Sequence, residues 1–110
     1  MSTLKNRQFK NGDVTLAATT WGDPNAQSIL LLHGGGQTRH TWNKLGKALE
    51  AANYYAISLD HRGHGDSDWS PSGDYSSDAF VSDIKAIITS LETAPIIVGA
   101  SLGGLMALLT

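Results

Sequence analysis

Residues 28–36 read SILLLHGGG, an apolar run that passes directly into a histidine and three glycines. Apolar residues on both faces of a strand are typical of the centre of a parallel sheet, which is covered on both sides. Glycine lets the main chain turn sharply and approach a ligand closely. The stretch therefore predicts a buried strand over Ser28–Leu32 that ends in a loop suited to a binding or catalytic role.

Strands and helices alternate on the carboxyl side of this stretch. Further apolar strands are predicted over residues 54–59 and 94–98. One helix is predicted from near Thr41 and a second from near residue 77, with Ser77 or Asp78 able to cap it. A third helix is predicted over residues 102–109. The residues expected on the buried faces are Trp42, Leu45, Leu49 and Ala52 in the first helix and Phe80, Ile84, Ile87, Ile88 and Leu91 in the second.

A hairpin is predicted on the amino side, between strands at residues 7–10 and Val14–Trp21. The two strands are joined at Asn11-Gly12, a pair that tolerates the positive φ of a tight turn. Alternating strands and helices are typical of a parallel sheet covered on both faces. We therefore expect an α/β fold, a doubly wound parallel sheet flanked by helices, with an antiparallel hairpin at one edge.

The composition excludes several classes of protein. Hydrophobic residues make up 41% of the 110 residues and charged residues 16%, which is globular rather than disordered. A net charge of −2 does not favour binding to nucleic acid, so no nucleic-acid partner is expected. Cysteine is absent from the sequence, which excludes disulfide scaffolds and thiol catalysis.

The apolar stretch over residues 94–109 is the one segment that resembles a membrane span. It is shorter than the ~20 residues that a spanning helix needs, and Pro95 and three glycines interrupt it. A buried strand followed by a buried helix is therefore expected, with no membrane span. The polar amino terminus does not resemble a secretory signal, and we expect a cytoplasmic protein.

Ser101 lies in the pentapeptide Gly99-Ala-Ser-Leu-Gly103, between the last predicted strand and the last predicted helix. A serine hydroxyl is a weak nucleophile that must be presented to a base without crowding, and a sharp strand-to-helix turn does this. Glycines at positions 99 and 103 let strand and helix approach closely. The N–H of Leu102, at the positive end of the helix, can then bind the oxyanion that forms when Ser101 attacks a carbonyl. The alternative is a plain glycine-rich turn whose serine caps the helix.

The glycine run after His33 offers main-chain N–H groups at the end of a buried strand. These groups could supply a second oxyanion donor, and His33 is expected to orient the loop through hydrogen bonds. A phosphate-binding loop needs a different glycine spacing, which the sequence lacks, so no nucleotide cofactor is expected. His61-x-x-His64 beside Asp60 invites a metal interpretation, but ligands packed into one tight loop are unusual, and no metal is expected.

Three motifs in order, each after a strand, resemble the amino-terminal half of an α/β-hydrolase-fold enzyme. They are residues 33–36 with Trp42, the pattern Asp60-x-Arg62-Gly-x-Gly-x-Ser67, and Gly99-x-Ser101-x-Gly103. The resemblance implies that Ser101 is the nucleophile and that the N–H groups of Leu102 and Gly35 form the oxyanion hole. Gly34 and Gly36 are neighbours that could share this role. It also implies structural roles for Asp60, Arg62 and Ser67, and serine at position 101 argues against the dehalogenase and epoxide hydrolase branches.

The family places the catalytic acid and then the histidine after the serine in chain order. Only nine residues follow Ser101 here, and none of them is Asp, Glu or His. We therefore expect residues 1–110 to be a partial domain that ends in the helix after the nucleophile, with acid and histidine missing. The serine strand would then be an open apolar edge, at which self-association is possible.

The leading functional hypothesis is a serine hydrolase that acts on an ester or related acyl bond of a small molecule. Two alternatives stay open. The 110-residue chain could be a non-catalytic fragment or binding module, because it lacks a base. The same scaffold could also serve an acyltransferase or a hydrolase of carbon–carbon bonds.

Overall fold

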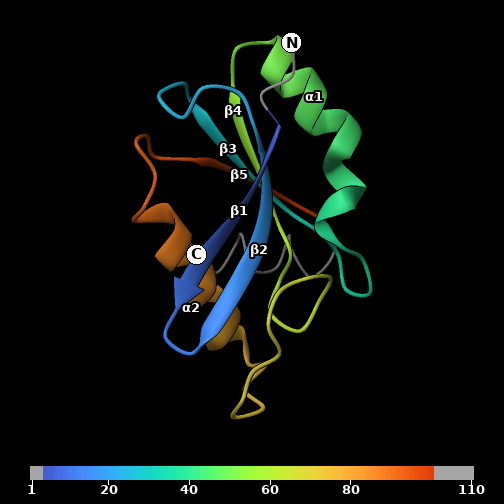
Figure 1. Ribbon diagram of the computed structural model, residues 1–110, viewed down its shortest axis with the longest axis vertical. Coiled ribbons are helices and arrows are strands. Elements are labelled where there is room, and N and C mark those ends of the chain that lie inside the picture. Colours follow the sequence, from blue (N-terminus) through green and yellow to red (C-terminus); the bar gives the residue numbers. More distant parts are fainter. Residues whose placement is uncertain (1–3, 101–110) are drawn as a thin grey trace.

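The computed structural model describes residues 4–100 of the chain, and its centre is a five-stranded sheet in the order β1-β2-β4-β3-β5 (Figure 1). The strands are β1 (Lys5–Asn11), β2 (Val14–Trp21), β3 (Ser28–Leu32), β4 (Tyr55–Leu59) and β5 (Ile96–Gly99). The helices are a short 3₁₀ turn, η1 (Arg39–Trp42), followed by α1 (Asn43–Ala51) and α2 (Ser77–Ile88).

The strand directions confirm the predicted α/β architecture. β3 runs parallel to both β4 and β5, whereas β2 pairs antiparallel with β1 and with β4. The hairpin thus forms one edge of the described sheet, and β5 forms the other. Leu32 lies opposite Leu59 on one side and Gly99 on the other, so the three parallel strands end at the same level. The loops after β3 and β4 therefore meet at the carboxyl end of the sheet, beside the end of β5.

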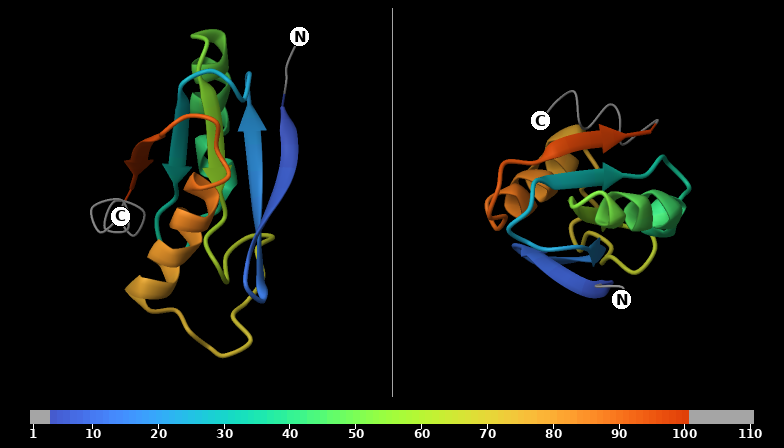
Figure 2. Two further views of the ribbon diagram at one scale, coloured as in Figure 1. Left: turned by 90° about the vertical axis from the view of Figure 1, so that its left-hand side faces the viewer. Right: turned by 90° about the horizontal axis from the view of Figure 1, so that it is seen from above.

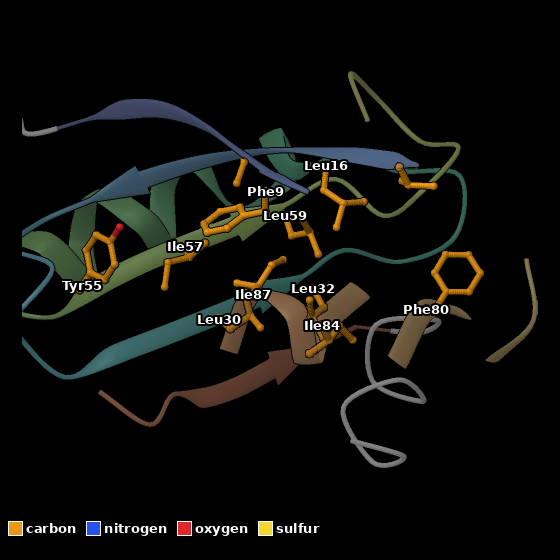
Figure 3. Close-up of a cluster of buried hydrophobic side chains, with 12 residues drawn as sticks. Phe9, Leu16, Leu30, Leu32, Tyr55, Ile57, Leu59, Phe80, Ile84 and Ile87 are labelled. Carbon is orange, nitrogen blue, oxygen red and sulfur yellow. The ribbon is translucent and has the colours of Figure 1, made fainter. Parts of the chain in front are cut away.

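The apolar run of β3 is explained by the two layers of side chains that it separates. Leu30 and Leu32 belong to a cluster with Ile84 and Ile87 of α2, and Figure 3 shows these side chains between the sheet and the helix. Ile29 and Leu31 belong to a second cluster, which contains Trp21 and Ala56. Because α1 and α2 cover opposite faces of the sheet (Figure 2), every residue of β3 is buried.

The buried face of α2 agrees with most of the predicted stripe. Phe80, Ile84 and Ile87 are buried and Ile88 is partly buried, whereas Leu91 lies beyond the end of the helix. The cap lies one residue earlier than predicted. Ser76 has an extended backbone, and its side chain accepts a hydrogen bond from the N–H of Ala79 at 3.2 Å. The cap is Ser76 because its position lets the hydroxyl reach the free N–H groups of the first turn.

The predicted stripe of α1 is only partly correct. Trp42 and Leu49 pack against the second cluster, but Leu45 is exposed and so is Ala52. The residue of α1 that is buried is Gly46. A Cβ built at this position would lie 2.5 Å from the ring of Trp21, so the helix approaches the sheet most closely where it has no side chain.

Among residues 4–100, no helix combines the length and the apolar character that crossing a bilayer requires. The part of the apolar stretch at 94–109 that the structure describes contains β5. The third predicted helix, residues 102–109, lies outside the described residues.

Gly46→Ala tests the close approach of α1 to the sheet. Alanine favours a helix over glycine by about 1 kcal/mol, whereas overpacking in a core costs roughly 1–3 kcal/mol. Because Trp21 is fully buried, we expect overpacking to dominate and the free energy of unfolding to fall in urea denaturation. Lys47→Ala, at an exposed position of the same helix, is the control and should change little. A Gly46→Ala protein at least as stable as the parent would contradict this packing.

Candidate active site

The ends of β3 and β5 bring two of the three predicted motifs together. Gly99 pairs with Leu32 in the register of the two strands. The N–H of Ala100 then donates to the carbonyl of Leu32 at 3.2 Å. Ala100 therefore lies beside the start of the loop at 33–36. Three predicted site residues, Ser101, Leu102 and Gly103, lie outside the described residues.

The glycine loop is a tight turn whose first residue has its main-chain groups occupied. The N–H of Gly34 donates to Oε1 of Gln37 at 2.9 Å, and the carbonyl of Gly34 accepts from the N–H of Gln37 at 3.1 Å. Gly36 has a φ of 75°, which favours glycine at this place in a turn. Gly34 is buried, while Gly35 and Gly36 are exposed. Within residues 4–100, the N–H of Gly35 has no acceptor, so it is available to a ligand.

His33 joins this loop to the loop after β4. It is fully buried, and its Nδ1 lies 2.7 Å from the carbonyl oxygen of Gly34, to which it donates. Its Nε2 accepts from the main-chain N–H of His61 at 3.1 Å. In return, Nε2 of His61 donates to the carbonyl of His33 at 3.2 Å. The two histidines thus form a reciprocal link between neighbouring loops.

Three histidine rings gather at this place. The ring centroids of His33 and His61 are 4.5 Å apart, and that of His64 lies 5.1 Å from His33. Burial lowers the pKa of His33, and burial together with the nearby His33 lowers the pKa of His61 to about 4. Among the described residues, no group of His, Cys, Asp or Glu side chains is arranged to hold a metal ion. The rings of His33 and His61 are instead neutral hydrogen-bonding groups.

Beneath the histidines, the fully buried carboxylate of Asp60 is surrounded by donors. Its oxygens accept from the main-chain N–H of Arg39 at 2.6 Å, from the Arg39 guanidinium at 2.5 Å and from the N–H of Asp66 at 2.9 Å. Burial alone would lower the pKa of Arg39, but the carboxylates of Asp66 and Asp60 outweigh it and raise that pKa. A Cβ built at Gly65 would meet this carboxylate at 2.3 Å, so the loop needs glycine there.

A second buried ion pair fixes the far side of the same loop. Nε and one terminal nitrogen of Arg62 each lie 2.7 Å from an oxygen of Asp83 in α2, in a two-point contact. Ser67 donates to the carbonyl of Asp60 at 2.6 Å and accepts from the N–H of Ala17 at 2.8 Å. These contacts tie the loop after β4 to α2 and to β2.

Sequence reasoning did not single out Arg39, Gln37 or Asp83. Each is a polar residue in a polar or amphipathic segment, and nothing in its local pattern distinguishes a buried partner from a solvated one. Their roles arise from contacts between segments that lie far apart in the sequence, apart from the short turn at Gly34–Gln37.

An open cleft of about 760 Å³ lies elsewhere, at the end of the sheet where the parallel strands begin. Its lining includes Tyr55, Gly22 and Leu91. Ligands of open α/β sheets bind beyond the carboxyl ends of the strands, and the loops described above meet at these ends. We therefore place the candidate site at the carboxyl end of the sheet and not in this cleft.

The buried histidines predict a fall in stability at acid pH. An unfolded His61 takes up a proton near its ordinary pKa of 6.5, whereas the folded chain resists protonation until about pH 4. The folded state is therefore the less protonated one, and its stability should fall as the pH drops from about 6.5 towards 4. Since one pKa unit corresponds to about 1.4 kcal/mol, His61 alone should reduce the free energy of unfolding by about 2 kcal/mol between about pH 7.5 and about pH 5.

Urea denaturation across this pH range measures the effect. In His61→Gln the pH dependence should be weaker than in the parent chain. His40→Gln, which removes an exposed histidine, is the control and should retain it. An equally steep loss of stability in His61→Gln would show that other groups cause it.

Comparison with known proteins agrees with this architecture. A family model described as the alpha/beta hydrolase fold matches residues 27–110. An esterase of Mycobacterium tuberculosis is 36% identical over 94 residues, which are 84% of this chain and 30% of the relative. An sn-1-specific diacylglycerol lipase of Mus musculus is 33% identical over 90 residues, 80% of this chain and 29% of the relative. The chain thus spans about a third of the length of these relatives.

Solved structures show the same similarity in three dimensions. A thioesterase domain from the curacin biosynthetic pathway superimposes with a TM-score of 0.88 at 27% identity, over 96% of this chain and 40% of its own. An epoxide hydrolase from Vigna radiata gives 0.86 at 26% identity, over 94% of this chain and 33% of its own. With the family model covering most of its length and relatives above 30% identity, the chain belongs to the α/β-hydrolase fold family.

Proposed function

We propose that this chain carries the nucleophile and the oxyanion donors of a serine hydrolase that cleaves an ester or related acyl bond. The observation that carries the proposal is the N–H of Gly35, which has no acceptor among residues 4–100. It lies on the loop after β3, and the neighbouring strand β5 leads through Ala100 into the Gly-x-Ser-x-Gly motif. A nucleophile and a free N–H donor are two of the groups that acyl transfer needs.

In the proposed reaction, Oγ of Ser101 attacks the carbonyl carbon of the substrate while a histidine takes up the hydroxyl proton. The carbonyl π electrons move to its oxygen, which becomes an oxyanion that the N–H groups of Leu102 and Gly35 bind. When the intermediate collapses, the alcohol leaves with the proton and the acyl group stays on Ser101. Water then attacks the acyl-enzyme in the same way and releases the acid.

The histidine and the acid of this mechanism are proposed to lie outside the 110 residues. The rings of His33 and His61 are buried and form hydrogen bonds with main-chain groups, so neither is suited to proton transfer at Ser101. The esterase and the lipase noted above are about three times as long as the segment that they share with this chain. We accordingly propose that residues 1–110 form the amino-terminal part of a hydrolase domain.

The substrate class is proposed to be a small carboxylic ester. The two relatives noted above are an esterase and a diacylglycerol lipase, and both names specify ester substrates. Serine at position 101 agrees with this class, because a serine alkoxide forms an acyl-enzyme that water can hydrolyse.

Ser101→Ala tests the nucleophile. We expect a fluorophosphonate probe to label the full-length protein and to leave Ser101→Ala unlabelled, because the probe forms a covalent bond with an activated serine. Ser72→Ala, on the exposed loop before α2, is the control and should label normally. Mass spectrometry of the labelled peptide identifies the modified residue. Equal labelling of the parent and of Ser101→Ala would overturn the proposal.

A pair of substitutions at Gly35 tests the oxyanion donor. Gly35→Pro removes the N–H, while proline suits the second position of a turn whose third residue, Gly36, has positive φ. Gly35→Ala keeps the N–H. Loss of one oxyanion donor costs roughly 100- to 1,000-fold in kcat, so we expect that fall for Gly35→Pro and a much smaller one for Gly35→Ala. Ester hydrolysis under saturating substrate measures the difference, and equal rates for the two variants would exclude Gly35 as a donor.

A further inference from the structure

The peptide unit between Gly34 and Gly35 connects the proposed oxyanion donor to the histidine pair. A peptide unit is planar and trans, so its N–H and its C=O point in opposite directions. The N–H of Gly35 and the carbonyl of Gly34 belong to the same unit. Any group that holds the Gly34 oxygen therefore also sets the direction of the Gly35 N–H.

Two donors hold that oxygen. Nδ1 of His33 lies 2.7 Å from it, and the N–H of Gln37 lies 3.1 Å from it. Both donors belong to the same chain segment. The Gly35 N–H points away from the Gly34 oxygen that they hold, and Gly35 is exposed. The direction of the donor is thus fixed before any substrate binds, which is the condition for effective stabilisation of an oxyanion.

This arrangement works with one tautomer of His33 only. Nδ1 must carry the proton, because it faces a carbonyl oxygen, and Nε2 must be bare, because it accepts the N–H of His61. The other tautomer would set two donors against each other at Nε2 and two acceptors against each other at Nδ1. Buried polar groups left without partners cost roughly 1–3 kcal/mol each, so the main-chain N–H of His61 selects the tautomer that holds Gly34.

The His61 side chain keeps that N–H in place. Its Nε2 donates to the carbonyl of His33 at 3.2 Å. Its ring is 1% exposed and meets the ring of His33 edge-on at 4.5 Å and that of Phe80 edge-on at 5.5 Å. The side chain and the main chain of His61 therefore each form a hydrogen bond with His33.

We propose that His61 is a positioning residue for the oxyanion donor, because it selects the tautomer of His33 that orients the Gly34–Gly35 peptide unit. The inference rests on the proposed function, since it concerns the donor of that site. His61 itself does not touch the substrate in this scheme. It acts by fixing the tautomer of His33, which in turn orients the peptide unit between Gly34 and Gly35.

Two variants separate positioning from packing. His61→Gln keeps a nitrogen donor near the place of Nε2, whereas His61→Leu fills similar space without any donor. His64→Gln is the control, because it removes another ring of the same cluster whose described hydrogen bond goes to the carbonyl of Arg62 instead. A residue needed only for packing would tolerate leucine better than glutamine.

The test combines nitrogen NMR with steady-state kinetics on the full-length protein. Imidazole ¹⁵N shifts report which nitrogen carries the proton. We expect a single Nδ1–H tautomer of His33 in the parent, in His61→Gln and in His64→Gln, and a mixture in His61→Leu. For a small ester, kcat should fall roughly 10- to 100-fold in His61→Leu with little change in KM, the size of effect found for outer-shell residues that orient metal ligands. His61→Gln should restore most of the activity.

Several results would overturn the inference. An Nε2–H tautomer of His33 in the parent would do so. This measurement needs only the parent protein, so it decides the question even if His61→Leu fails to fold. An unchanged tautomer and kcat in folded His61→Leu would do so as well. Ester hydrolysis that persists in Ser101→Ala would instead refute the proposed function, so the two failures are distinguishable.

Discussion

A buried carboxylate is stable only where donors replace the water that it has lost, and the loops at the carboxyl edge of this sheet are arranged around one such group. Asp60 follows β4 directly and is fully buried. Its donors come from the start of η1 and from its own loop. Because removing one partner would leave a charge without compensation, the segments that carry Arg39 and Asp66 cannot move away from Asp60 independently. The position of the loop after β3 depends on this constraint, because that loop runs straight into η1.

The histidine pair adds a second connection between the same two loops, of a different chemical kind. Asp60 and Arg39 interact as charges, whereas His33 and His61 interact as neutral rings with defined tautomers. His33 precedes the glycine turn directly, and Arg39 follows it, two positions after Gln37. Together they fix both ends of the segment that contains Gly35. These contacts restrain a turn of three consecutive glycines, two of which are exposed.

The regular parts of this architecture were open to prediction from the sequence, and the polar contacts were not. The strands β3 and β4 are rich in apolar residues because both of their faces are covered, and the large apolar residues of α2 repeat at helical spacing. The contact of α1 at Gly46 could not be predicted from apolar spacing, because glycine has no side chain. Leu45 was wrongly assigned to the buried face. Arg39 and Asp60 are 21 positions apart, and no local periodicity relates them. The composition of the glycine loop predicts exposed main-chain N–H groups, but the tautomer of His33 that holds the Gly34 carbonyl depends on a contact with a different loop.

The fixed direction of the Gly35 N–H has a consequence for how such a protein could change during evolution. In the proposed hydrolase, a donor held on both sides would recognise a single oxygen atom, whatever groups lie on either side of the carbonyl. Discrimination between one acyl chain and another would then come from segments that do not contact Asp60 or the histidine pair. Substrate preference could diverge widely while residues 33–39 and 60–67 stay the same, because the chemistry and the choice of molecule are separated in the chain.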